Sequence, residues 1–153
     1  MRKKVTEEHD KNRVILYARV SSTTNKASLD GQIERMRLYA AAKGYVIVGE
    51  TKEIASGLNE NRKKLNSILK RTDYDILLVE HKDRLIRFGY NYIKILLDNK
   101  QQKIEIINNP ESKDKIQELT EDFISIVTSF CGRLYGANRK VKTREIIETI
   151  KTT

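Results

Sequence analysis

The feature that most constrains this 153-residue sequence is a regular alternation of strand-like runs with helical patterns. Apolar and β-branched residues concentrate in four short runs, at 14–20, 45–48, 75–79 and 103–107. Helical patterns lie between consecutive runs, and parallel strands need crossover connections of this kind. The βαβαβαβ order therefore predicts an α/β fold: a mostly parallel sheet of four or more strands flanked by helices, followed by a long C-terminal helix.

The helical patterns have identifiable ends. Apolar residues between 29 and 40 are spaced by 4, 3 and 4 positions, which predicts a helix capped by Ser28 and ended by Gly44. Further helices are predicted around 65–69 and 92–97. Residues 51–61 are polar and include Gly57, so we expect a loop there.

Residues 115–136 contain no proline and predict one long helix. Its apolar seam has the heptad-like spacing 3, 4, 3 and 4. Two interpretations stay open: the helix packs on its own sheet, or the seam is a subunit interface. The seam residues are Ile116, Leu119, Phe123, Ile126 and Phe130.

The charge balance points to a polyanionic partner. The chain has 30 Lys and Arg against 21 Asp and Glu, a formal net charge of +9. Nucleic acid is the first candidate for such a chain and an anionic membrane the second. The basic segment 137–144 is interpreted either as a solvated helix end or as a tail along a phosphate backbone. Its basic residues are Arg139, Lys140, Lys142 and Arg144.

Several classes of protein are excluded by what the sequence lacks. Cys131 is the single cysteine, which excludes a disulfide scaffold, and no uninterrupted apolar run is longer than five residues, so none can span a membrane. Residues 1–10 do not form a signal peptide, so the cytoplasm is the expected compartment. Because no phosphate-binding glycine loop and no zinc-ligand spacing occur, we expect neither a metal nor another cofactor.

Arginines follow the ends of the predicted strands. Arg19 lies two positions before Ser21 at the end of the first run, and Arg84 and Arg87 follow the third run. Arg62 comes after the loop that follows the second run. Because the carboxyl ends of parallel strands meet at one edge, these arginines are predicted to converge near the Ser21 hydroxyl. Guanidinium groups bind phosphate oxygens bidentately, so the pattern favours phosphoryl transfer without a metal.

The same residues belong to motifs that resemble the catalytic domain of serine recombinases, the resolvase and invertase superfamily. The resemblance extends from about residue 14 to 139, and 81–89 and 119–139 look most like the transposases of IS607-type insertion sequences. The motifs are YARVS at 17–21, LDGQ at 29–32, ASG at 55–57 with the later Arg62, and DRL at 83–85 with Arg87.

The resemblance implies a role for each matching residue. Ser21 matches the nucleophile, with Ser22 as the competing hydroxyl, and Glu53 stands where many relatives carry aspartate. Gln32 and Asp83 match supporting active-site positions of the family. The matching active-site and phosphate-binding arginines are Arg19, Arg62, Arg84 and Arg87, and either Lys70 or Arg71 fills a further basic position.

From these features we expect a DNA strand transferase that works through a 5′-phosphoserine intermediate and needs neither metal nor ATP. Its expected partner is double-stranded DNA, and the resemblance implies a homodimer at rest and a tetramer in synapsis. The alternative is a non-catalytic DNA-binding regulatory or oligomerisation module. The expected organisation is a lead-in or linker (1–13), the catalytic domain (14–114), an oligomerisation helix (115–137) and a basic tail (138–153). Because neither end of the chain is long enough for a DNA-binding module of about 50 residues, we expect either a catalytic domain cut from a longer protein or a truncated gene product.

Overall fold

A four-stranded parallel sheet forms the centre of the molecule. The computed structural model describes residues 11–107, 114–134 and 139–152. The strand order is β2-β1-β3-β4, and all three neighbouring pairs are parallel. This confirms the predicted fold class. The strands are β1 (Arg13–Val20), β2 (Val46–Ile54), β3 (Ile76–Val79) and β4 (Lys103–Ile106).

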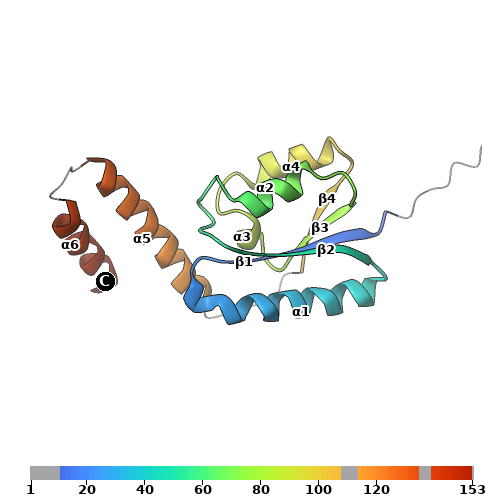
Figure 1. Cartoon of the computed structure of the whole chain (residues 1–153), viewed down its shortest axis with the longest axis horizontal. Coiled ribbons are helices and arrows are strands. Elements are labelled where there is room, and N and C mark those ends of the chain that lie inside the picture. Colours follow the sequence, from blue (N-terminus) through green and yellow to red (C-terminus); the bar gives the residue numbers. More distant parts are fainter. Residues whose placement is uncertain (1–10, 108–113, 135–138, 153) are drawn as a thin grey trace, which may run out of the picture.

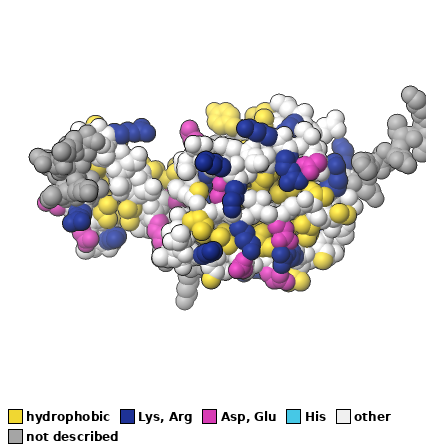
Figure 2. Space-filling view, in the orientation of Figure 1, with side chains coloured by type: hydrophobic (Ala, Val, Ile, Leu, Met, Phe, Trp, Pro, Cys, Tyr) yellow, Lys and Arg dark blue, Asp and Glu magenta, His cyan; other side chains and the backbone are white. Residues whose placement is uncertain are grey.

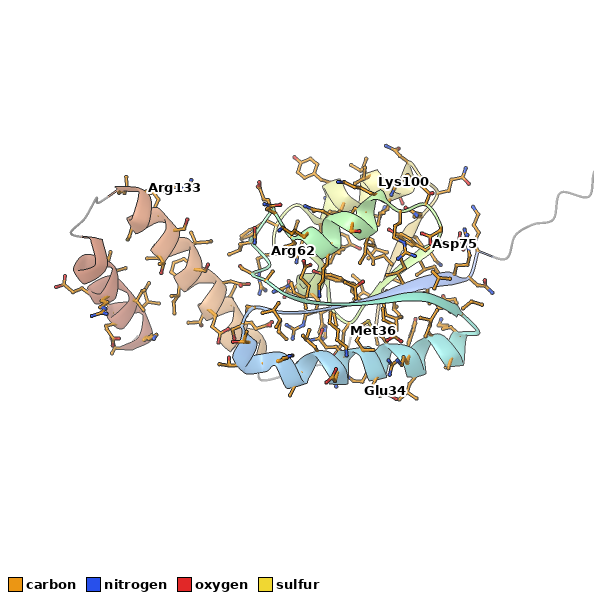
Figure 3. All side chains as sticks on the ribbon, in the orientation of Figure 1. Glu34, Met36, Arg62, Asp75, Lys100 and Arg133 are labelled. Atoms are coloured by element: carbon orange, nitrogen blue, oxygen red, sulfur yellow. The ribbon has the colours of Figure 1, made fainter. Side chains whose placement is uncertain are left out.

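Helices cover both faces of this sheet (Figure 1). Helix α1 (Lys26–Lys43) lies on one face, and α2 (Lys63–Lys70) and α4 (Tyr90–Asp98) lie on the other. Alternate residues of β1 supply the two cores: Leu16 packs with the α1 residues, including Met36, whereas Tyr17 packs with those of α2 and α4. Met36 points from α1 toward the sheet in Figure 3. Burying one large apolar side chain in this way contributes about 1.5–3 kcal/mol.

Two predicted boundaries were wrong. Strand β2 extends through 51–54, which we expected to be a loop, because these residues pair with β1 as far as Val20 and Ile54. Helix α1 does not begin at Ser28: it begins at Lys26, directly after the short 3₁₀ helix η1 (Thr23–Asn25). The predicted end of α1 is confirmed, since Gly44 has a left-handed conformation with φ of 71°.

The spacing of three positions between Arg84 and Arg87 predicts that they share a helix face. This prediction was wrong, because the single turn α3 (Lys82–Leu85) that follows β3 contains Arg84 and ends before Arg87. One further helix was not anticipated. Helix α6 (Arg139–Thr152) occupies the segment expected to be a basic tail.

The long helix α5 (Asp114–Leu134) and α6 form an arm that projects away from the sheet (Figure 1). The apolar seam of α5 does not pack on the sheet, because Phe123 is 51% exposed and Phe130 is 60% exposed. Leu119 and Ile126 are exposed as well, while the side chain of Ile116 lies outside the described residues. No helix in the described part of the chain is long and apolar enough to cross a membrane.

On the face shown in Figure 2, Lys and Arg side chains are spread over the sheet body and are interspersed with Asp and Glu. The positive charge on this face is therefore not concentrated in one patch. The arginines that the sequence places together follow the ends of the strands.

Candidate active site

The loops that follow β1, β2 and β3 meet at one edge of the sheet. Val20 is paired with Ile54, so Ser21 and the segment 55–57 leave neighbouring strands side by side. Strand β3 ends at Val79, in register with Tyr17 of β1, and leads into α3. The sequence-based prediction placed Ser21 and the arginines at this edge because parallel strands end together there.

Arg19 joins these loops to one another. Its side chain is completely buried, and its guanidinium donates hydrogen bonds to the backbone carbonyls of Arg84 (2.9 Å), Ala55 (2.9 Å) and Asp83 (2.6 Å). Burial lowers the pKa of this guanidinium below its ordinary value. The resemblance implied that Arg19 binds phosphate, but here its donors hold the backbone of the loops that carry the other arginines.

Two neighbours fix the position of Arg19. The side-chain amide of Gln32 accepts from the Arg19 backbone N–H (3.3 Å) and donates to its carbonyl (3.1 Å). Gly57 leaves room for the guanidinium, because a Cβ at this position would lie 3.0 Å from Arg19 Nη2. Gln32 thus supports the site through Arg19, which agrees with the supporting role that the resemblance implied.

Replacing Arg19 with lysine is expected to destabilise the fold. A lysine ammonium cannot donate to three carbonyls on two loops with the geometry of a planar guanidinium, so buried carbonyls lose their donors. We expect the free energy of unfolding, measured by urea denaturation, to fall by about 3 kcal/mol. Arg37→Lys, at an exposed ion pair with Glu50, is the matched control. A loss of only about 1 kcal/mol in Arg19→Lys would contradict the role of Arg19 as the tie between the loops.

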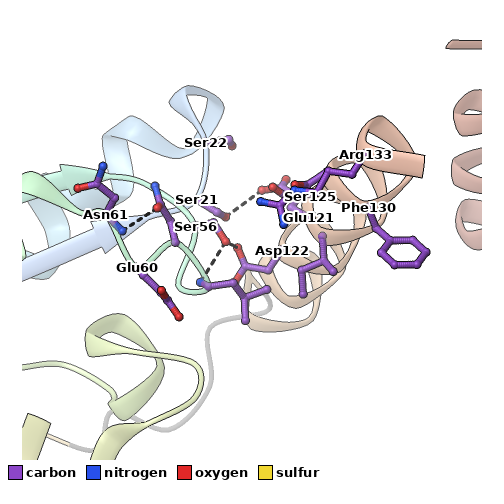
Figure 4. A pocket seen from close by; sticks show the side chains of 14 residues that line it. Ser21, Ser22, Ser56, Glu60, Asn61, Glu121, Asp122, Ser125, Phe130 and Arg133 are labelled. Atoms are coloured by element: carbon purple, nitrogen blue, oxygen red, sulfur yellow. Dashed lines mark hydrogen bonds between the residues drawn. The ribbon is translucent and has the colours of Figure 1, made fainter. Parts of the chain in front are cut away.

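Ser21 is half-buried, and two carboxylates of α5 contact it. Its backbone N–H donates to Glu118 Oε1 (3.2 Å), and its hydroxyl donates to Glu121 Oε2 (3.1 Å). Figure 4 shows Ser21 facing Glu121, and both residues line a cavity of about 840 Å³ between the sheet edge and α5. Polar lining residues of this cavity include Ser22, Ser56, Asp122, Ser125, Ser129 and Arg133.

The two arginines that follow β3 form ion pairs with the same helix. Arg84 Nη1 donates to Glu118 Oε2, and both side chains are buried. Arg87 Nη2 lies 3.0 Å from Asp122 Oδ2, and its Nη1 lies 3.1 Å from Asp83 Oδ2. Arg84 is only 4% exposed, so it lies in the interior rather than on a loosely packed surface loop.

Ser56 completes the contacts of the acidic side chains. Its hydroxyl donates to Asp122 Oδ1 (2.8 Å) and accepts a hydrogen bond from the Leu58 backbone N–H (3.2 Å). Asp122 therefore binds a loop that follows β2 and, through Arg87, the segment that follows α3. Its side chain is completely buried.

Arg62 directly precedes α2, and Figure 3 shows it between this helix and the sheet. Its guanidinium donates to the Leu85 carbonyl and lies 5.9 Å from the centre of the Tyr17 ring. The Tyr17 hydroxyl donates to Glu53 (2.6 Å), and Glu53 also accepts the Lys64 backbone N–H (3.0 Å) at the start of α2. Arg62 and Glu53 thus support the site from below, and burial raises the pKa of the Tyr17 hydroxyl.

The structure does not bring every predicted residue to Ser21. Lys70 ends α2 and Arg71 pairs with Asp73 just before β3 begins, at the opposite edge of the sheet. Arg144 is exposed on α6. The side chains of Arg139, Lys140 and Lys142 lie outside the described residues.

The sequence-based prediction missed the acids of α5 and Ser56. Acidic residues were sought only near strand ends, whereas Glu118, Glu121 and Asp122 lie on a helix about 100 residues after Ser21. Their spacing of 3 and 4 positions from Glu118 places them on one helix face. This row, adjacent to the apolar seam, was the signal that could have identified them.

Comparison with known proteins places the chain in a family. Residues 14–151 match the family model described as "Resolvase, N terminal domain". A putative resolvase of Acanthamoeba polyphaga mimivirus is 35% identical over 132 residues, which cover 82% of this chain and 65% of the relative. The chain thus spans slightly less than two-thirds of that relative's length.

Solved structures extend the likeness to the fold. The C-terminal catalytic domain of ISC1926 TnpA, an IS607-like serine recombinase, is 43% identical with a TM-score of 0.80, over 91% of this chain and 99% of that one. A serine recombinase from Sulfolobus solfataricus is 33% identical with a TM-score of 0.73, over 92% and 99% of the two chains. With its family match over nearly the whole chain, the protein belongs to the resolvase family of serine recombinases, and its catalytic domain is of the IS607-like kind.

Proposed function

We propose that this chain cuts and rejoins DNA strands through a covalent bond between Ser21 and a DNA phosphate. One observation carries the proposal. The carboxylate of Glu118 touches the Ser21 backbone N–H with one oxygen and the Arg84 guanidinium with the other. The donors at this edge therefore already hold an anion beside the candidate nucleophile. A phosphate oxygen bound by the same donors would lie next to the Ser21 hydroxyl.

The proposed reaction is an in-line displacement at phosphorus. The Ser21 Oγ–P bond forms as the bond from phosphorus to the 3′ oxygen breaks, which gives a 5′-phosphoserine and a free 3′-hydroxyl. The serine loses its proton, and the leaving 3′ oxygen gains one. The number of phosphodiester bonds is unchanged, so a 3′-hydroxyl can reverse the step and rejoin the strand without ATP.

Arg84 and Arg87 would supply the positive charge that the transition state requires. Negative charge accumulates on the phosphate oxygens as Ser21 attacks. A unit positive charge 4 Å away contributes about 4 kcal/mol at an effective dielectric constant near 20. Two guanidinium groups fixed by surrounding structure thus provide the stabilisation that a metal ion supplies in other phosphoryl-transfer enzymes.

The arm formed by α5 and α6 fits a subunit interface. Phe123 and its seam neighbours are exposed along α5, and a second copy of the helix would bury them. We propose that this seam forms the homodimer and contributes to a tetramer on double-stranded DNA. The basic residues at the start of α6, together with Arg144, would then follow the phosphate backbone.

Phe123→Asp tests the interface. Because Phe123 is 51% exposed, the change is expected to leave the circular dichroism spectrum close to native. A charge in an apolar interface opposes association, so light scattering should show a shift from dimer to monomer. Strand exchange should be lost along with the oligomer. Leu38→Asp, at a position 65% exposed on α1, is the control and should leave the mass unchanged; an unchanged mass in Phe123→Asp would contradict the interface.

Incubation with supercoiled DNA, followed by denaturation in SDS, tests the proposed function itself. A serine recombinase gives protein–DNA complexes that survive SDS. The alternative of a non-catalytic DNA-binding or oligomerisation module predicts no such complexes. That alternative accounts for the positive charge and for the long helix, but not for a serine hydroxyl among buried arginine–carboxylate pairs at the strand ends.

A further inference from the structure

The acids of α5 hold the positions that a DNA phosphate would need. We call Glu118, Glu121 and Asp122 the acidic row. Glu118 pairs with Arg84, Asp122 pairs with Arg87, and Glu121 accepts the hydrogen bond of the Ser21 hydroxyl. The side chains of Glu118 and Asp122 are 4% and 0% exposed, so these are interior contacts.

We propose that the acidic row is an internal substitute for the scissile phosphate, which keeps the site closed until α5 withdraws it. The inference rests on the proposed function, because it describes how the same site is regulated. A phosphate and these carboxylates compete for the same N–H donors of Arg84 and Arg87. Adding a phosphodiester while the row is in place would put four anionic groups beside Ser21, and like charges at such short distances repel strongly.

The row also ties down the nucleophile. The Ser21 hydroxyl donates to Glu121 and its backbone N–H donates to Glu118, so one helix holds both hydrogen-bond donors of this residue. In-line attack requires the hydroxyl oxygen to approach a phosphorus atom. The Glu121 carboxylate occupies one side of that oxygen, so a phosphorus atom cannot approach it from there.

The carboxylates are an incomplete match for the arginines, so a phosphate can replace them. Asp122 directs one oxygen to Ser56 and the other to Arg87. Among the described residues, no acceptor reaches the buried Arg87 Nε. A phosphate group that is not divided between Ser56 and Arg87 is able to direct two oxygens to the guanidinium fork.

The outer part of α5 is not held by packing on the sheet. Beyond Asp122 the helix carries exposed apolar side chains, including Phe130 at 60% exposure, and it projects away from the sheet (Figure 1). Packing on the sheet therefore does not fix its outer half. Withdrawal of α5 would break the ion pairs of the row without disturbing the two cores of the sheet.

The test compares E118Q/D122N with the wild-type chain. Gln and Asn keep acceptor oxygens but remove the charges that compete with phosphate. Inorganic phosphate is titrated into ¹⁵N-labelled protein, and the Nε–Hε signals of Arg84 and Arg87 are followed by NMR. The apparent affinity for an anion is reduced by the fraction of molecules whose site is closed, so the variant should bind phosphate roughly tenfold more tightly or better. The same variant should form SDS-resistant DNA adducts roughly tenfold faster than wild type.

A matched control removes two negative charges at positions away from the site. Glu34 and Asp98 are exposed and pair with Arg37 and Lys94, away from the site. E34Q/D98N should leave phosphate binding at Arg84 and Arg87 and the adduct rate at wild-type values. An equal gain in this control would overturn the proposal, because it would show a general effect of net charge. If E118Q/D122N does not fold, each substitution is tested singly, and a gain in phosphate binding is expected from each.

The two readouts separate this proposal from the proposed function. Unchanged or weaker phosphate binding in the folded row variants would overturn the closed-site proposal, even where wild-type protein forms adducts. A loss of adducts in E118Q/D122N without a gain in phosphate binding would show that the acids support catalysis instead. Tighter phosphate binding with no DNA adduct in any variant would support the row as a phosphate substitute and contradict strand exchange.

Discussion

Ser21→Ala is expected to abolish covalent DNA adducts. The hydroxyl oxygen is the atom that would bond to phosphorus. Loss of the nucleophile of a serine enzyme reduces turnover by about 10⁴-fold or more. The Glu118 contact uses the Ser21 backbone N–H, so the substitution keeps that hydrogen bond and the fold. Noncovalent DNA binding and the oligomeric state should therefore stay close to wild type. Adduct yield is measured on SDS gels, noncovalent DNA binding by mobility shift, and the oligomeric state by light scattering.

Ser22→Ala is the matched control. The Ser22 hydroxyl bonds to Thr24 Oγ1 (2.7 Å), on the η1 side of the turn, and Figure 4 shows it away from Glu121. This variant should retain adduct formation. Peptide mapping of a trapped adduct identifies the bonded residue directly. Phosphoserine at Ser22, Ser28 or Ser56 would contradict the assignment to Ser21. A bond to Tyr17 is not expected, because that side chain is fully buried and its hydroxyl donates to Glu53.

Arg84→Lys is expected to lower adduct formation by about 100-fold while the protein stays folded. Lysine keeps one positive charge near Glu118 but lacks the bidentate fork that binds phosphate oxygens. A loss of this size is typical when one donor to a developing negative charge is removed. The Arg19–Arg84 hydrogen bond uses the Arg84 carbonyl, so the tie between the loops survives. Adduct rates and thermal melts by circular dichroism check both statements.

Alanine at the same position should behave differently. Arg84→Ala would leave the buried Glu118 carboxylate without its partner, and breaking a buried pair in this way destabilises a protein by about 3–5 kcal/mol. Lost activity in Arg84→Ala would therefore mix a folding defect with a catalytic one. Arg37→Lys, at an exposed pair with Glu50, is the control for replacing an arginine with lysine. Wild-type adduct rates in a folded Arg84→Lys variant would contradict the assigned role.

The sequence alone predicted the parallel sheet and the edge where Ser21 lies. Strand and helix periods are local properties, and the ends of parallel strands follow from the crossover rule. The same local signals misplaced the end of β2, because polar residues of an edge strand resemble a loop when only their composition is considered. Helix α6 was missed for a similar reason, since its sequence is dominated by charge rather than by an apolar face.

Only the tertiary structure decided how the site residues are used. Arg19 was predicted to bind phosphate near the Ser21 hydroxyl, whereas the partners of its guanidinium are backbone carbonyls, which no sequence motif specifies. The pairing of Arg84 with Glu118 and of Ser21 with Glu121 depends on where α5 docks, across 34 and 100 positions of sequence. Local periodicity fixes which side chains share a face of a strand or helix. The partner of a buried charge is fixed by the need to compensate its lost hydration, and only the folded chain determines which opposite charge is within reach.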